Sequence, residues 1–179
     1  EYLTQRILQE AGDPRGAAIT AALLAMGVQT YVEVFDGYSG DHGFSYEDLT
    51  MDAIGAGFSV LRSAFPELGR KVDFRMEYLH SRNAKFSPIS DYSGQKYVLA
   101  LKLSGFDAFQ DSPLRFVELQ AGYYGRGFTP AEKKRGEKRR REPYVGIGIN
   151  LSPLLDGSDS APALAAQRFL EYVQLPYTY

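Results

Sequence analysis

The sequence predicts an α+β fold, with an N-terminal helical hairpin, a four-stranded antiparallel sheet and a C-terminal helix. Apolar residues recur at helical spacing through the first 70 residues. From Val72 to Tyr78, in contrast, apolar and charged residues alternate, which indicates a strand. The links between the later apolar segments are rich in turn residues, which favours an antiparallel meander. We therefore expect a helical part over residues 1–70 and a sheet part over 71–179, packed as one compact unit.

Three helices are expected in the first part, over residues 2–11, 15–35 and 45–65. Ser45 is a suitable N-cap for the third helix, and Pro66 ends it. The second helix has about the length of a short membrane span, although Thr20, Gln29 and Thr30 dilute its apolar character. A buried helix of a soluble bundle and a helix in contact with a membrane are both compatible with this pattern.

The strands of the second part are expected over residues 72–78, 96–105, 114–125 and 144–152. The charged stretch 129–143 is expected to be a loop between the last two strands. A final helix is expected over 161–173, with Pro162 in its first turn, where proline is tolerated. The sequence begins at Glu1 inside an expected helix, so we expect the natural N-terminus to lie upstream.

The composition excludes several classes of site. The chain has 179 residues and no cysteine, which rules out a disulfide scaffold, a cysteine-ligated metal and a cysteine nucleophile. The net charge of −2 is unevenly distributed, because residues 1–70 carry ten acidic and four basic residues, whereas 71–179 carry twelve acidic and sixteen basic ones. Such an asymmetry is typical of a two-part organisation.

Four carboxylates form a candidate acidic cluster on the second and third helices: Glu33, Asp36, Asp48 and Asp52. Their spacing places each pair on one helical face, and Gly55 and Gly57 would allow the two helices to approach closely. Four converging carboxylates could bind a hard cation or share a proton. The alternative is that they are solvent-exposed charges near the ends of the helices.

A basic segment lies between the last two expected strands. Residues 132–142 contain seven basic and three acidic side chains, with the cations concentrated at Lys138, Arg139, Arg140 and Arg141. We predict that these four contact anionic lipid headgroups. A solvated hairpin loop is the alternative, and nucleic acid is not expected as a partner because no aromatic residues interleave the segment.

Aromatic residues lie near the ends of the expected strands: Tyr97, Phe106, Tyr123, Tyr124, Phe128 and Tyr144. This placement suits a membrane interface and suits an ordinary sheet equally well. Four strands are too few to close a membrane barrel, for which about eight is the usual minimum.

Several motifs resemble the YfiM-like family of predicted bacterial envelope lipoproteins. They are EVFDG (33–37), GFSYED (43–48) and DAIGAG (52–57), then DYSGQKY (91–97), LKLSG (101–105), ELQAGYY (118–124) and PYVGIGIN (143–150). The resemblance extends over residues 28–179, and the helical part is also similar to VanZ-like membrane proteins. It implies a location in the bacterial cell envelope, periplasmic or outer-membrane associated, and no established activity.

We therefore expect a non-enzymatic, membrane-associated envelope protein that contacts anionic lipid or an envelope protein and needs no cofactor. The alternative function is a carboxylate-based metal-binding protein or an enzyme acting on an envelope lipid, using the acidic cluster. A cation site would require the four carboxylates to lie within roughly 6 Å of one another.

Overall fold

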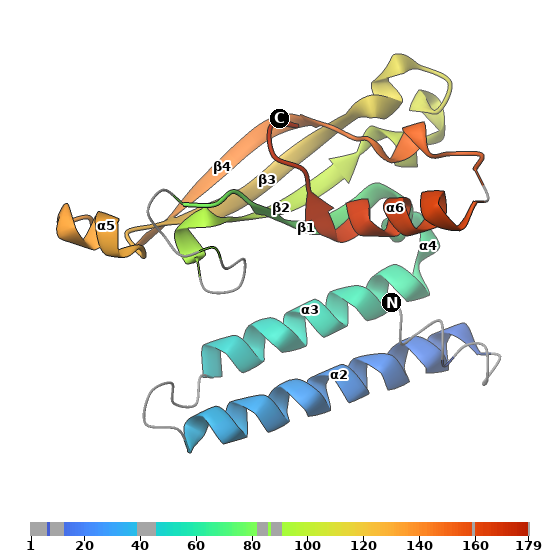
Figure 1. Cartoon of the computed structure of the whole chain (residues 1–179). Coiled ribbons are helices and arrows are strands. Elements are labelled where there is room, and N and C mark those ends of the chain that lie inside the picture. The colour runs from blue at the N-terminus through green and yellow to red at the C-terminus, as the bar shows by residue number, and fades with distance from the viewer. Residues whose placement is uncertain are drawn as a thin grey trace. The chain divides into compact units, whose positions relative to one another are not determined.

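The computed structural model of the chain describes residue 7 and residues 13–38, 46–81, 86, 91–158 and 160–178. The chain divides into two compact units, residues 1–69 and 70–179 (Figure 1).

The first unit contains the helix pair α2 (Pro14–Gly37) and α3 (Tyr46–Ala64), which contact each other along their lengths. The carboxylate of Asp13 caps α2 by accepting hydrogen bonds from the N–H groups of Arg15 and Gly16, at 3.1 and 2.9 Å. A short helix, α4 (Pro66–Lys71), follows α3. The expected helical hairpin is confirmed, whereas the helix expected over 2–11 lies outside the described residues except for Ile7.

The second unit is built on a mixed sheet of five strands in the order β4-β3-β2-β1-β5 (Figure 1). Its strands are β1 (Val72–Tyr78), β2 (Gln95–Lys102), β3 (Val117–Arg126), β4 (Arg140–Ile149) and β5 (Val173–Gln174). The first four form the expected antiparallel meander, and β5 pairs with β1 in parallel. The fifth strand was not predicted because two residues are too few to show an alternating pattern.

The C-terminal helix α6 (Ala161–Tyr172) contacts β1 and leads directly into β5. It confirms the helix expected at this end of the chain. In Figure 1, α6 runs beside the sheet, and the C-terminal segment returns from it toward β4. The N–H of Ile149 donates to the carbonyl of Thr178 at 2.7 Å, which fastens this segment to the edge of β4.

The charged stretch 129–143 is not the plain loop that its composition predicts. It contains the helix α5 (Pro130–Lys134) and the first residues of β4. Thr129 and Glu132 form a reciprocal capping box, in which each side chain accepts a hydrogen bond from the other residue's N–H. The capping signal Thr-Pro-Ala-Glu was present in the sequence, but the density of charge around it concealed the helix.

Candidate functional site

The two faces of the sheet have opposite polarity, and the polar face is the buried one. On β1 the charged side chains of Asp73, Arg75 and Glu77 are at most 4% exposed. Between them, Phe74 on the opposite face is 44% exposed. In a water-soluble antiparallel sheet the apolar face is ordinarily the one that packs on the core. This inversion is the main feature of the second unit.

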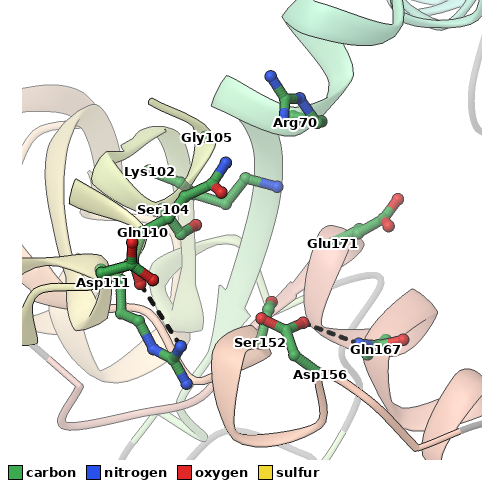
Figure 2. Close-up of a pocket in the computed structure, with 11 residues that line it drawn as sticks. Arg70, Lys102, Ser104, Gly105, Gln110, Asp111, Ser152, Asp156, Gln167 and Glu171 are labelled. Carbon is green, nitrogen blue, oxygen red and sulfur yellow. Dashed lines mark hydrogen bonds between the residues drawn. The ribbon is translucent and has the colours of Figure 1, made fainter. Parts of the chain in front are cut away.

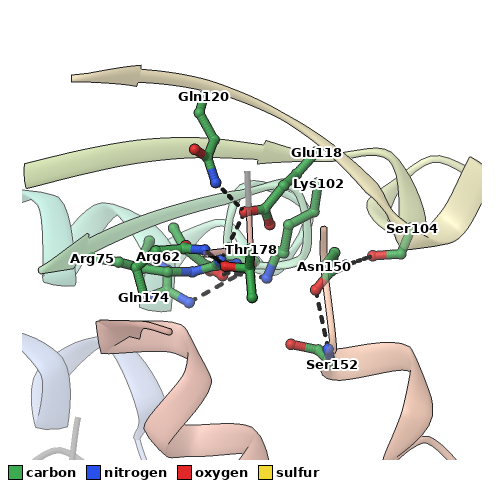
Figure 3. Close-up of polar contacts among 12 residues, drawn as sticks. Arg62, Arg75, Lys102, Ser104, Glu118, Gln120, Asn150, Ser152, Gln174 and Thr178 are labelled. Atoms are coloured by element: carbon green, nitrogen blue, oxygen red, sulfur yellow. Dashed lines mark hydrogen bonds and ion pairs between the residues drawn. The ribbon is translucent and has the colours of Figure 1, made fainter. Parts of the chain in front are cut away.

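A network of ion pairs occupies the buried face (Figure 3). The guanidinium of Arg75 donates from Nη1 to Oε1 of Glu118 at 3.0 Å and from Nη2 to Oδ2 of Asp73 at 2.7 Å. Lys102 Nζ donates to the other oxygen of Asp73 at 2.9 Å. From β5, Gln174 Oε1 accepts a further hydrogen bond from Arg75 Nη1, at 2.8 Å. Two cations and two carboxylates thus neutralise each other, as buried charges require.

The opposite face is a continuous apolar surface, here called the apolar sheet face. It consists of rows of side chains that the strand register places directly opposite one another: Val72, Leu101, Leu119 and Ile147 in one row, then Phe74, Leu99, Ala121 and Val145 in the next. Exposure rises toward β4, where Ile147 is 67% and Val145 is 85% exposed. An exposed apolar patch of this kind commonly marks a binding surface.

An aromatic row and then a single arginine follow the aliphatic rows on the same face. The aromatic row contains Tyr97 and Tyr123, whose ring centroids lie 5.2 Å apart in a stacked arrangement. The Tyr97 ring also stacks on Phe74, at 6.2 Å. Two residues further along the strands, Arg141 lies opposite Gly125. The order aliphatic, aromatic, cationic is the order found at a membrane–water interface.

A polar cleft of about 500 Å³ lies at the other end of the second unit (Figure 2). Three cations and three carboxylates line it: Arg70, Lys102, Arg115, Asp111, Asp156 and Glu171. Lys102 also belongs to the buried network, and Gln167 Nε2 donates to Asp156 Oδ1 at 3.3 Å across the rim. Opposite charges balance in this cleft, so its lining indicates no single charge for a ligand.

The predicted acidic cluster is only partly described. Glu33 and Asp52 are half-buried, and Asp52 Oδ2 accepts a hydrogen bond from Gln29 Nε2 at 3.2 Å, which links α2 to α3. Asp36 and Asp48 lie on the two helices by their backbone, but their side chains lie outside the described part of the chain. Among the described residues, no group of three or more histidine or acidic side chains could hold a metal ion. The acidic cluster therefore stays a prediction.

The two glycines on α3 do not mediate the contact between the helices. A Cβ added at Gly55 or Gly57 would meet no atom within 4 Å, so both positions face open space. The pairing of α2 with α3 is therefore not based on close backbone approach at these positions.

The predicted lipid-contacting cations are exposed at the end of the sheet. Lys138 and Arg139 precede β4, and Arg140 and Arg141 are its first residues. Arg140 Nε pairs with Glu142 Oε1 at 2.6 Å, and the guanidinium of Arg139 lies 5.7 Å from the centroid of Phe128. The neighbouring strand adds Arg126, which the register places opposite Arg140. Alternation along the strands places Arg141 on the apolar sheet face and the Arg140–Arg126 pair on the opposite face.

The helix α2 adds a second apolar surface. By length and composition, the stretch Arg15–Phe35 could cross a membrane, and it is the only such helix among the described residues. Its mean hydropathy is 1.5, and only 11% of the stretch is buried. This exposure disfavours the buried helix of a soluble bundle. A signal sequence near the N-terminus has the same length and composition.

One comparison with known proteins found a match. Residues 1–64 match the model of a family described as predicted periplasmic lipoprotein, DUF2279. The match confirms the expected location in the bacterial cell envelope, and the apolar helix α2 lies within the matched segment. The resemblance expected over 28–179 is therefore supported only as far as residue 64. No curated protein and no solved structure matches the chain.

Sequence reasoning missed the buried network altogether. Its members are separated by 43 residues between Arg75 and Glu118 and by 99 between Arg75 and Gln174, so no local motif joins them. The available signal was the alternation of Asp73, Arg75 and Glu77 with apolar residues on β1. That alternation predicts a strand with two unlike faces and leaves open which face is buried.

Proposed function

We propose that this envelope protein is a non-enzymatic, peripheral membrane protein that lays its apolar sheet face on an anionic lipid surface. The observation that carries the proposal is the inverted polarity of the sheet. Buried ion pairs on one face and aliphatic side chains exposed on the other are what a lipid-facing sheet requires. A bilayer would remove Val145 and Ile147 from water without any further folding of the chain.

The dimensions of the surface favour contact with one leaflet over a complete span. From Val117 to Tyr123 on β3 the apolar rows extend over seven residues, and the steps between them span about 20 Å of strand. The hydrocarbon core of a bilayer is about 30 Å thick, so this band is too short to cross it upright. The band ends at a cation on one side, where Arg141 follows the aromatic row. A face-on, interfacial contact fits this pattern.

The charge of the surrounding surface supports anionic headgroups as the polar partner. Arg141 follows the aromatic row on the apolar sheet face, where headgroups meet acyl chains, and Lys138, Arg139 and Arg140 precede it directly in the chain. A juxtaposed polybasic segment contributes roughly 1 kcal/mol per cation near an anionic membrane surface. The exposed apolar surface of α2 offers a second contact with the same membrane.

The test is co-flotation of the full chain with phosphatidylethanolamine–phosphatidylglycerol vesicles. Ile147→Ser removes an aliphatic group from the apolar sheet face. Because each Å² of apolar contact contributes roughly 25 cal/mol, the substitution should weaken binding about tenfold. Leu154→Ser is the matched control, because Leu154 is also 67% exposed but lies outside the sheet. It should leave binding unchanged.

Two outcomes would contradict the proposal. One is that the chain stays at the bottom of the gradient even at low salt. The other is that Ile147→Ser and Leu154→Ser weaken flotation equally, because the apolar sheet face would then have no special role. Retention of a protein from envelope extract, without any binding to vesicles, would point instead to a protein partner for this face.

A further inference from the structure

The outer edge of β4 carries backbone groups that no other strand binds within the described part of the chain. β4 is the outermost strand of the sheet. The N–H of Ile149 points outward to Thr178, whereas the N–H of Asn150 points inward to the carbonyl of Phe116, at 2.8 Å. Successive residues of a strand direct these groups to alternate sides, so residues 143, 145, 147 and 149 face the free edge.

Two of these four positions have no donor to offer. Pro143 has no N–H, which is the usual reason for proline on an outward position of an edge strand. The N–H of Ile149 is already bound to Thr178. Between them, Val145 and Ile147 each present an N–H and a carbonyl that pair with no strand in the described part of the chain.

We propose that this edge pairs with the same edge of a second copy of the chain, antiparallel, about a two-fold axis at Gly146. In this register Val145 lies opposite Ile147 of the second copy, and Ile147 lies opposite Val145 of the second copy. Each pair exchanges two hydrogen bonds, so the four free groups of each copy are all satisfied. The inference concerns a partner and goes beyond the proposed lipid contact, which it does not require.

Neighbouring registers leave a group unpaired. If the axis passed through Val145, the carbonyl of Ile147 would face Pro143 of the second copy, which has no N–H. If the axis passed through Ile147, the carbonyl of Val145 would face the N–H of Ile149, which Thr178 already occupies. Only the register centred on Gly146 satisfies every free group between the two blocked positions.

The side chains agree with this pairing. A two-fold axis perpendicular to the sheet keeps the apolar faces of both copies on the same side. The row that ends at Ile147 then continues into Val145 of the second copy. Arg140 and Arg141 of one copy lie at the opposite end of the new ladder from those of the other copy, so their charges do not face each other. Two copies would therefore present one apolar face over eight antiparallel strands.

Disulfide trapping of the full chain tests the proposal, because the chain has no natural cysteine. Gly146→Cys places the thiol at the two-fold axis, where opposed Cα atoms would lie about 4.5 Å apart, within disulfide range. An added Cβ at Gly146 meets no atom within 4 Å, so the variant should fold. Leu99→Cys is the control, since Leu99 is 45% exposed on the same sheet but lies on a central strand.

The expected result on mild oxidation is a disulfide-linked dimer of Gly146→Cys, at a yield roughly fivefold above that of Leu99→Cys. A higher yield for Val145→Cys or Ile147→Cys would overturn the register. A higher yield for Leu99→Cys would overturn edge pairing in favour of dimers stacked through the apolar sheet face. Equal, low yields for all four variants would overturn the dimer.

A second variant separates this inference from the lipid contact. Val145→Pro removes one outward N–H but keeps an apolar side chain on the face. It should shift the chain to monomer in sedimentation velocity runs while flotation with vesicles persists. If Val145→Pro remains as dimeric as the unaltered chain, the edge of β4 is not the dimer interface, irrespective of the flotation result.

Discussion

Arg75 and Glu118 form a buried ion pair across the strand that separates them. Their strands, β1 and β3, flank β2, and Arg75 Nη1 reaches Glu118 Oε1 at 3.0 Å over the surface of β2. The residues of β2 beneath this contact are the fully buried Val98 and Ala100, whose small side chains leave room for the guanidinium. The network therefore links four strands, β1, β2, β3 and β5, through side chains as well as through their backbones.

Glu118→Gln should destabilise the second unit strongly. The substitution removes one of two carboxylates that balance Arg75 and Lys102, and it leaves an uncompensated buried cation. Breaking one side of a buried ion pair costs about 3 kcal/mol or more, so the urea midpoint should fall clearly. Glu137→Gln is the control, because the pair of Glu137 with Arg135, at 2.9 Å, is exposed. An exposed pair of this kind contributes little, and if both variants lost equal stability the network would not act as a buried unit.

Glu132 should make the stability of the fold depend on pH in the acidic range. Burial of the Glu132 carboxyl opposes ionisation, but hydrogen bonds from the Ser93 hydroxyl and from Thr129 outweigh it and lower the pKa to about 2. A folded-state pKa below the unfolded value contributes stability that is present above the unfolded pKa, near 4.5, and is lost as the pH falls toward 2.

The measurement is urea unfolding of the unaltered chain and of Glu132→Gln between neutral pH and about pH 2.5. At neutral pH the variant should be less stable by roughly 2 kcal/mol, and the difference should shrink below about pH 4. The urea midpoint of Glu137→Gln, which lies on the same segment, should change with pH in the same way as that of the unaltered chain. A difference between Glu132→Gln and the unaltered chain that does not change with pH would show that the charge of Glu132 is not what stabilises the segment.

The elements of the fold could be predicted from local patterns, whereas the orientation of the sheet could not. The alternation from Val72 to Tyr78 was sufficient to place β1, because the period of two is a property of the strand alone. Which face of β1 is buried depends on Gln174 and α6, a hundred residues away in the sequence. The same limit applies to the candidate surface, since the exposed fraction of Val145 or Ile147 follows from that orientation.

The segment 129–137 shows a different limit. Its charge density predicted a loop with nothing to bury, yet Thr129 is 5% and Glu132 is 7% exposed.

A Gly-Ser replacement of residues 133–137, which keeps Thr129, Glu132 and β4, should leave the melting temperature nearly unchanged. Replacement of 129–137 removes the capping box and the hydrogen bond to Ser93, and should cost about 2 kcal/mol, which is several degrees for a unit of this size. Equal melting temperatures for the two replacements would show that the capping box does not contribute.

The cations at the start of β4 should provide the salt-sensitive part of membrane binding. Replacing Lys138, Arg139, Arg140 and Arg141 with serine should weaken binding to vesicles rich in phosphatidylglycerol by at least tenfold at low salt. The loss should fall short of the roughly 4 kcal/mol that four free cations would supply, because Arg140 is already paired with Glu142. Binding of the unaltered chain should decline as NaCl rises to about 0.5 M, since screening shortens the range of exposed charges.

The matched comparison is Ile147→Ser, which alters the apolar sheet face and leaves the cations in place. Its binding at low salt should be weaker than that of the unaltered chain, yet should fall as steeply when NaCl is added. The four-serine variant should bind weakly at every salt concentration, with almost no dependence on salt. The two variants thus separate the apolar contribution from the electrostatic one on neighbouring stretches of the chain, within β4 and directly before it. Equal binding of the unaltered chain to neutral and anionic vesicles, at every salt concentration, would exclude Lys138, Arg139, Arg140 and Arg141 as headgroup contacts and leave apolar surfaces as the basis of attachment.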